Sequence, residues 1–258
     1  MDVTVVGSGY VGTTLAACLA DVDHDVTAID IDPEVVAALN EGRATIHEPG
    51  LDELLSRHAG DRLHATTSYD PVPESDVTFL AVGTPSNDDG SIDLAGLSAA
   101  AETTGEALAG LSENDRHLVV IKSTITPPGV ETIREAVRRG AGPAADRIEV
   151  ATNPEFLREG SAVDDFKNPD KVVFGTSSEW GAERLETLYE PVLAGLDVPI
   201  VRTAPETAMM IGLVTPPASL MLRASLCPLM PGRSMSSTIS PGFFSASILP
   251  ASNPSKAW

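Results

Sequence analysis

The chain has 258 residues and a formal net charge of −20, and it contains no apolar run long enough to predict a membrane span. Its 37 acidic against 17 basic side chains argue against nucleic acid as a partner, because binding phosphates requires lysine and arginine. Two cysteines are too few for a disulfide framework and no signal-peptide core begins the chain, so we expect a cytoplasmic protein.

The acidic residues are spread over many segments rather than gathered in one block. This distribution is typical of the surface of a salt-adapted protein, because at molar salt the Debye length is only about 3 Å and self-repulsion is screened. We therefore expect a halophilic origin. A specific cationic partner is the alternative.

Short apolar runs alternate with longer segments of helical period along the first 210 residues. Strands are predicted at 2–9, 25–32, 76–85, 116–124, 148–152, 171–175 and 199–203. Helices are predicted at 11–22, 33–42, 50–60, 94–111, 127–140 and 178–193. This alternation indicates an α/β fold of the Rossmann type, a doubly wound, mainly parallel sheet with helices on both faces, over residues 1–211.

The composition changes after Ile211. Residues 212–258 contain no Asp or Glu but hold seven of the 20 prolines, and no helical or strand period is sustained. We predict an irregular, Pro/Ser-rich tail. Its content of Leu, Met, Phe and Ile is unusual for a linker, and we hypothesise that the reading frame is lost near Ile211, since a shifted frame replaces Asp and Glu codons.

The segment GSGYVG, residues 7–12, matches the G-x-G-x-x-G fingerprint between a first strand and a helix. Its glycines permit a tight turn, a close backbone approach to pyrophosphate and close helix–strand packing. Asp30 ends the second strand, where an acid can bind ribose hydroxyls, which favours NAD over NADP. The predicted cofactor-binding residues here are Gly7, Gly9, Tyr10, Val11, Gly12 and Asp30.

Polar residues follow two further predicted strands. Thr84 comes after one of them, and Ser123 and Thr124 come after another. Ligands of open α/β sheets bind outside the carboxyl ends of the strands, so these residues are candidates for the same site. A threonine at a strand end can equally well serve only to cap the next turn.

The segment NPEFLREG, residues 153–160, follows the predicted strand 148–152. Asn153 is a good N-cap and Pro154 suits the first helical position, so we predict a helix start there. Glu155 and Glu159 would then lie on one helical face. The pair either belongs to the helix start alone or forms the rim of an active site.

No metal site is predicted. His24, His58, His64 and His117 show no ligand spacing and are expected at the surface or in turns. The acidic stretch 87–90 lacks the distal glutamate of a calcium loop and is predicted to be a turn. Cys18 is expected in the core of the first helix.

Six motifs in this order, GSGYVG, the Asp30 strand, IHEPGL (46–51), VGTPS (82–86), IKSTI (121–125) and NPEFLREG, resemble the UDP-glucose 6-dehydrogenase family and the wider UDP/GDP-sugar dehydrogenase superfamily. The resemblance covers roughly residues 1–211. AVDDFKNPDKVVFG, which follows the last motif, favours the UDP-glucose branch.

The resemblance implies an NAD-dependent double oxidation of UDP-glucose at C6 to UDP-glucuronate, through an aldehyde and a cysteine thioester. Glu155 and Glu159 would flank the sugar, with Glu159 also near the nicotinamide. Thr124 would place the catalytic water and, like Thr84, contact the cofactor. The substrate-binding residues would be Glu155, Phe156, Leu157, Arg158 and Glu159. The family forms homodimers.

The chain departs from the family after Ile211. The family's active-site lysine and asparagine would fall on Gly212 and Pro216, and Cys227 lacks the glycines that surround the family's nucleophile. The long dimerisation helix and the UDP-sugar domain are not recognisable. We therefore expect a defective fragment with weak NAD binding and little or no turnover.

Two alternatives stay open. The chain could be a different NAD-dependent dehydrogenase, acting on another sugar nucleotide or on a hydroxy acid. It could also be a non-catalytic NAD-binding module that pairs with another chain. Substrate screening separates the first from the UDP-glucose enzyme, and cofactor binding without turnover would favour the second.

Overall fold

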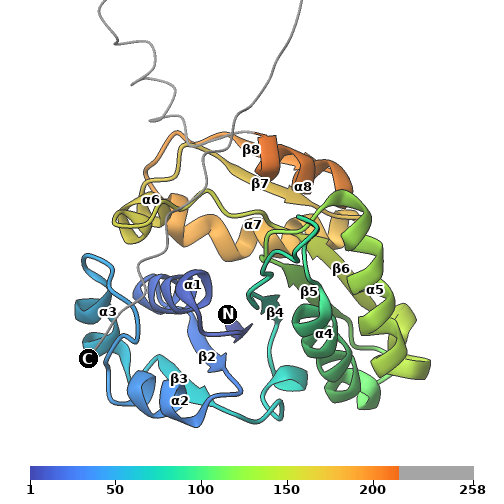
Figure 1. The fold of residues 1–258 in the computed structure, drawn as a ribbon, viewed down its shortest axis with the longest axis horizontal. Coiled ribbons are helices and arrows are strands. Elements are labelled where there is room, and N and C mark those ends of the chain that lie inside the picture. Colours follow the sequence, from blue (N-terminus) through green and yellow to red (C-terminus); the bar gives the residue numbers. More distant parts are fainter. Residues whose placement is uncertain (215–258) are drawn as a thin grey trace, which may run out of the picture.

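The computed structural model describes residues 1–214, so the predicted tail lies outside the described residues from position 215 onwards. Eight strands form one sheet in the order β3-β2-β1-β4-β5-β6-β7-β8 (Figure 1). They are β1 (Asp2–Val6), β2 (Asp25–Ile29), β3 (Leu63–Thr66), β4 (Val77–Leu80), β5 (His117–Ile121), β6 (Ile148–Thr152), β7 (Val172–Gly175) and β8 (Ile200–Thr203).

Neighbouring strands run parallel except for β6 and β7, which meet antiparallel at Thr152 and Gly175. The expectation of a mainly parallel, doubly wound sheet is confirmed. Strand β3 was not predicted from the sequence. Only Leu63 of its four residues is buried, so the segment carries almost no apolar signal.

Eight α-helices flank the sheet within the described residues. They are α1 (Tyr10–Asp21), α2 (Pro33–Asn40), α3 (Leu51–His58), α4 (Ala95–Ala107), α5 (Pro127–Ala141), α6 (Ala162–Lys167), α7 (Glu179–Leu193) and α8 (Pro205–Val214). Two of them begin at side-chain caps, where Asp32 accepts from the amide of Glu34 and Ser178 accepts from that of Gly181.

Apolar side chains of the strands alternate between two hydrophobic clusters. Val5 and Val120 pack into the cluster that includes α1, α3 and α7, whereas Val6 and Val119 pack into the cluster beneath α4 and α5. Figure 1 shows α4 and α5 side by side on one side of the sheet. Successive residues of a strand point to opposite faces, so helices cover both faces.

The turn from β1 into α1 depends on two glycines. Gly7 has φ +94°, and a Cβ there would lie 2.9 Å from the backbone of Ala81. A Cβ on Gly12 would lie 1.8 Å from the Gly7 carbonyl oxygen. Neither position can hold a side chain unless the backbone moves. A Cβ on Gly9, by contrast, would meet no atom within 4 Å.

The predicted helix start at Asn153 is wrong. Residues 153–161 form a loop, and α6 begins only at Ala162. The Asn153 side chain is buried and its amide donates to the Val173 carbonyl at 2.8 Å, so it does not cap a helix. A hydrogen bond to β7, distant in the sequence, therefore overrides the local preference for a helix N-terminus.

Two histidines predicted at the surface are buried instead. His117 begins β5, whose five residues are all buried, and its Nε2 lies 2.8 Å from the Thr78 hydroxyl. Burial lowers the pKa of His117 to about 4, so the ring is neutral. His24 is buried with Nε2 2.9 Å from the Leu188 carbonyl oxygen. His58 is half-buried beside Asp21.

Two other local expectations, for Cys18 and for residues 87–90, are confirmed. Cys18 is fully buried on α1, and residues 87–90 form a turn in which Gly90 has φ +82°. Residues 1–214 contain no cluster of three His, Cys, Asp or Glu side chains suited to a metal ion. None of the helices in the same range combines the length and apolar character that a membrane crossing requires.

Substituting alanine for Gly12 and for Gly9 should change the stability by very different amounts. Gly12→Ala should lower the free energy of unfolding by about 3 kcal/mol or more, because its Cβ overlaps backbone. Gly9→Ala should change it by less than about 0.5 kcal/mol, because its Cβ meets open space. Urea unfolding at constant salt measures both values, and equal stabilities of the two variants would contradict the packing described here.

Candidate functional site

The carboxyl ends of β1 and β2 bring the predicted fingerprint residues together. Gly9 is exposed where α1 begins, so amides of the first turn of α1 are accessible beside it. The Asp30 carboxylate accepts from the amides of Ser8 at 2.7 Å and Asp32 at 3.0 Å. These bonds hold an anion beside the turn and leave lone pairs for hydroxyl donors.

An exposed apolar residue next to Asp30 was not predicted. The Ile31 side chain is 89% exposed, the largest exposed fraction among the big apolar side chains of the described residues. It offers a flat apolar surface beside the carboxylate. The only signal in the sequence is its position after the second strand, and that position alone cannot distinguish a buried isoleucine from an exposed one.

The loops that follow β4 and β5 are joined by a hydrogen bond. The Thr84 hydroxyl donates to the Thr124 carbonyl oxygen at 2.7 Å. Thr124 is itself exposed, whereas Ser123 is buried and its hydroxyl donates to the Val82 carbonyl oxygen at 2.6 Å. Thr84 and Thr124 therefore lie together at the carboxyl edge, and Ser123 serves the packing of the loops.

Glu155 and Thr124 line a common cavity of about 210 Å³ next to α8. One oxygen of the Glu155 carboxylate accepts from the Leu157 amide at 2.6 Å, which orients the side chain. Met209, Gly212 and Leu213 of α8 complete this cavity. The structure thus places one predicted acid beside the predicted hydroxyl, although no helix carries it.

Glu159 lies elsewhere, close to the start of α1. Its residue is exposed, and its negative charge contributes to the raised pKa of Tyr10, which is caused first by burial and then by Glu48. The hydroxyl of Tyr10 donates to Glu48. Glu155 therefore lines the Thr124 cavity, whereas Glu159 is an exposed residue next to Gly160, whose amide donates to the Tyr10 hydroxyl at 3.3 Å.

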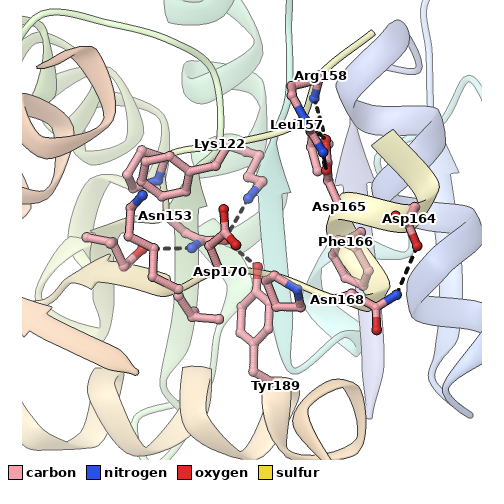
Figure 2. A pocket seen from close by; sticks show the side chains of 16 residues that line it. Lys122, Asn153, Leu157, Arg158, Asp164, Asp165, Phe166, Asn168, Asp170 and Tyr189 are labelled. Atoms are coloured by element: carbon pink, nitrogen blue, oxygen red, sulfur yellow. Dashed lines mark hydrogen bonds and ion pairs between the residues drawn. The ribbon is translucent and has the colours of Figure 1, made fainter. Parts of the chain in front are cut away.

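A second cavity, of about 120 Å³, lies under the 153–158 loop (Figure 2). The buried Lys122 ammonium donates to the Asn153 side-chain oxygen at 3.0 Å, and the buried Tyr189 hydroxyl donates to the same oxygen at 2.6 Å. Burial lowers the pKa of Lys122 to about 8, against the opposing effect of the Glu155 charge. Lys122 lies in the IKSTI motif, but no role was predicted for it from the sequence.

Phe156, Leu157 and Arg158 also line this second cavity. Both the backbone amide and the guanidinium of Arg158 donate to Asp165, the amide at 2.8 Å. The Lys171 ammonium lies 4.2 Å from the centre of the Phe156 ring, a cation–π contact. The three predicted substrate-facing residues are thereby held in one conformation by α6 and the segment before β7.

The depressed pKa of Lys122 predicts a pH-dependent stability. Its folded pKa lies below its unfolded value, so the unfolded chain holds the extra proton between about pH 8 and 10.5 and the free energy of unfolding rises through that window. Relative to Lys122→Met, the native chain should gain about 2–3 kcal/mol between pH 7.5 and 10. Urea unfolding at each pH measures this gain.

Lys171→Met provides the control, because this lysine lines the same cavity but is only half-buried. Its stability difference from the native chain should stay nearly constant with pH. A difference for Lys122→Met that is equally flat would contradict a desolvated ammonium at that position.

Comparison with known proteins identifies the family. Residues 1–193 match the model of the UDP-glucose/GDP-mannose dehydrogenase family, NAD binding domain. UDP-glucose 6-dehydrogenase AglM of Haloferax volcanii is 50% identical over 215 residues, which are 82% of this chain and 49% of that protein.

Solved structures give the same result. A UDP-glucose dehydrogenase of Pyrobaculum islandicum is 39% identical with a TM-score of 0.74, over 81% of this chain and 48% of that one. A ternary complex of GDP-mannose dehydrogenase from Pseudomonas aeruginosa is 34% identical with a TM-score of 0.77, over 88% and 51%. The chain spans about half the length of these relatives. It belongs to the UDP-glucose/GDP-mannose dehydrogenase family and contains that family's NAD-binding domain.

Proposed function

We propose that the chain is the NAD-binding half of a UDP-glucose 6-dehydrogenase, whose reaction oxidises C6 of UDP-glucose to give UDP-glucuronate. The observation that supports the proposal is that Glu155 and Thr124 line one cavity, while Gly160, the neighbour of Glu159, bonds to Tyr10 and Glu48 at the start of the fingerprint helix. Identities of 50% and 39% to UDP-glucose enzymes, against 34% to a GDP-mannose enzyme, favour the UDP-glucose branch.

The residues at the turn fit a dinucleotide. Gly9 leaves open space beside the first turn of α1, and a Cβ there would occupy the space that pyrophosphate needs. Asp30 can accept hydrogen bonds from ribose hydroxyls and would repel a 2′-phosphate. NAD, when bound, supplies the hydride acceptor of the reaction.

The chain's own residues would accept protons and orient the reacting water. Glu155 and Glu159 are carboxylates at the edge of the site, where they can accept a proton from a sugar hydroxyl or a water. The Thr124 hydroxyl, exposed to the Glu155 cavity, would orient that water. Thr84 would hold the Thr124 loop in place through its bond to the Thr124 carbonyl.

The described residues lack two groups of the family's reaction, the nucleophilic thiol of the second oxidation and the active-site lysine. Cys18 is the only thiol within residues 1–214, and burial raises its pKa to about 12, so it cannot act as a nucleophile. Gly212 occupies the position equated with the family's lysine, and a Cβ there would lie 2.5 Å from Pro154 Cβ. We propose that this polypeptide by itself supports little or no turnover.

We also propose that the host is salt-adapted. Residues 1–210 carry 37 acidic and 14 basic side chains, and the 50% identical relative comes from Haloferax volcanii. Screening at molar salt would reduce the self-repulsion of such a surface. Assays therefore belong in about 2 M potassium chloride, where the Debye length falls to a few ångströms.

NAD binding should depend on the open space at Gly9. Gly9→Ala should weaken NAD binding about tenfold or more, because its methyl group takes the place of a pyrophosphate oxygen, while its stability stays native. NADP should bind the native chain more weakly than NAD because of Asp30. Isothermal titration calorimetry measures all three affinities. Equal affinity of Gly9→Ala and the native chain for NAD would contradict the placement of pyrophosphate at this turn.

The purified chain should not reduce NAD when UDP-glucose is added, as followed by absorbance at 340 nm. Adding the carboxyl-terminal half of the Haloferax volcanii enzyme, the part beyond the matched region, should restore reduction with UDP-glucose and not with GDP-mannose. Robust turnover by the chain alone would overturn the proposed inactivity. Restored activity with GDP-mannose alone would overturn the proposal that UDP-glucose is the substrate.

A further inference from the structure

Glu48 is a buried carboxylate that the proposed chemistry does not use. Its residue is 4% exposed and lies in the segment between α2 and α3. It accepts three hydrogen bonds: from the hydroxyl of Tyr10, from the amide of Gly160 at 2.8 Å and from the amide of Ala162 at 2.8 Å. One side chain thus joins the first residue of the fingerprint helix to the end of the 153–161 loop.

These bonds connect parts of the chain that are far apart in the sequence. Tyr10 and Glu48 are separated by 38 positions, and Glu48 and Ala162 by 114. A carboxylate in a buried position is costly unless donors satisfy it, and hydrogen bonds to a charged group are stronger than those between neutral groups. The three donors therefore hold Glu48, and Glu48 in turn holds the loop against α1.

The other links between the loop and α1 on the side of Glu159 are longer, since the Tyr10 hydroxyl lies 3.3 Å from both the Arg158 carbonyl oxygen and the Gly160 amide. Gly160 is exposed with φ +84°, and Glu159 is exposed as well. On the other side, the amide of Arg158 is bound to Asp165, which belongs to α6 and not to the fingerprint helix. The two bonds of the Glu48 carboxylate, from the amides of Gly160 and Ala162 at 2.8 Å, are thus the shortest links between this region and the Tyr10–Glu48 pair at the start of α1.

The Tyr10 hydroxyl keeps its proton in this arrangement. Burial and the neighbouring Glu48 carboxylate raise the pKa of Tyr10 above its ordinary value, so the hydroxyl stays a donor at neutral pH. Tyr10 is also the first residue of α1, adjacent to the exposed Gly9. A ligand bound at this turn would therefore lie next to Tyr10, the residue that Glu48 contacts.

We propose that Glu48 is a positioning residue that couples dinucleotide binding at the start of α1 to the order of residues 158–162, and thereby holds Glu159 beside the cofactor. Coupling between two sites is reciprocal. If the Glu48 contacts strengthen NAD binding, bound NAD must stabilise the contacts of Gly160 and Ala162 by the same factor. The proposal rests on the NAD-binding domain and does not require turnover.

The experiment compares Glu48→Gln with Glu149→Gln. A glutamine has one acceptor oxygen, so Glu48→Gln leaves an amide of the loop facing an NH₂ group. Glu149 is a matched control near the start of β6, at the amino ends of the parallel strands and so away from the fingerprint turn. It is also a buried carboxylate, and it accepts from the amides of Ser177 at 2.8 Å and Ser178 at 3.1 Å.

Three quantities are measured for the native chain and both variants: stability in urea, affinity for NAD by calorimetry, and hydrogen exchange of the 157–162 amides with and without NAD. Both variants should be less stable than the native chain. Only Glu48→Gln should weaken NAD binding, by about tenfold, within the range usual for coupled sites. Only the native chain and Glu149→Gln should show slower exchange at residues 160 and 162 on adding NAD.

Native NAD affinity in Glu48→Gln would overturn the proposal and leave Glu48 with a structural role alone. An equal loss of affinity in Glu149→Gln would overturn it as well, because general destabilisation would then explain both. A native chain that binds NAD without any protection of residues 160 and 162 would show that the sites are not coupled. Absence of turnover with intact NAD binding bears on the proposed function and not on this coupling.

Discussion

The close approach of α1 to β1 is the constraint on which the remaining structure depends. At Gly12 the helix lies so near the Gly7 carbonyl that a methyl group cannot fit, and at Gly7 the turn touches the backbone of Ala81 after β4. Three backbone segments therefore meet at two glycines. This contact fixes where α1 begins, and so it fixes the exposed amides beside Gly9 and the position of Tyr10.

From Tyr10 the constraint extends to the rest of the site. Glu48 binds the Tyr10 hydroxyl and the two amides of the Gly160 region, so the loop that carries both predicted acids is attached to the fingerprint helix at one end. At the other end Asn153 is held by Lys122, Tyr189 and the Val173 carbonyl. A loop fixed at both ends can present Glu155 and Glu159 in defined directions without regular secondary structure.

The buried polar groups follow one rule in a strongly acidic chain. Glu48 and Glu149 are both buried and accept from backbone amides and hydroxyls, Glu149 also lies 3.7 Å from the Arg116 guanidinium, and the Lys122 ammonium donates to an amide oxygen. Neutral dipoles thus stabilise charges in the interior, since burying a charge without such partners costs several kcal/mol. The remaining carboxylates lie mostly at the surface, where salt can screen them.

The order of the elements and the cofactor turn could be predicted from the sequence, because they rest on local patterns. Apolar runs, helical periods and the spacing of Gly7, Gly9 and Gly12 all act over a few residues. The exception among the strands was β3, with Leu63 as its single buried residue. Asp30 lies beside the fingerprint turn, as its position after the second strand predicts.

Only the tertiary structure decided what happens at residues 153–161. Asn153 and Pro154 favour a helix locally. However, the Asn153 side chain donates to the Val173 carbonyl of β7 and accepts from Lys122, just after β5, and from Tyr189 of α7, and these bonds hold a loop. The burial of His117 and the role of Glu48 were hidden for the same reason, since their partners lie 39 and up to 114 positions away. Local propensities are worth tenths of a kcal/mol per residue, whereas an unsatisfied buried polar group costs about 1–3 kcal/mol, so the distant partners prevail.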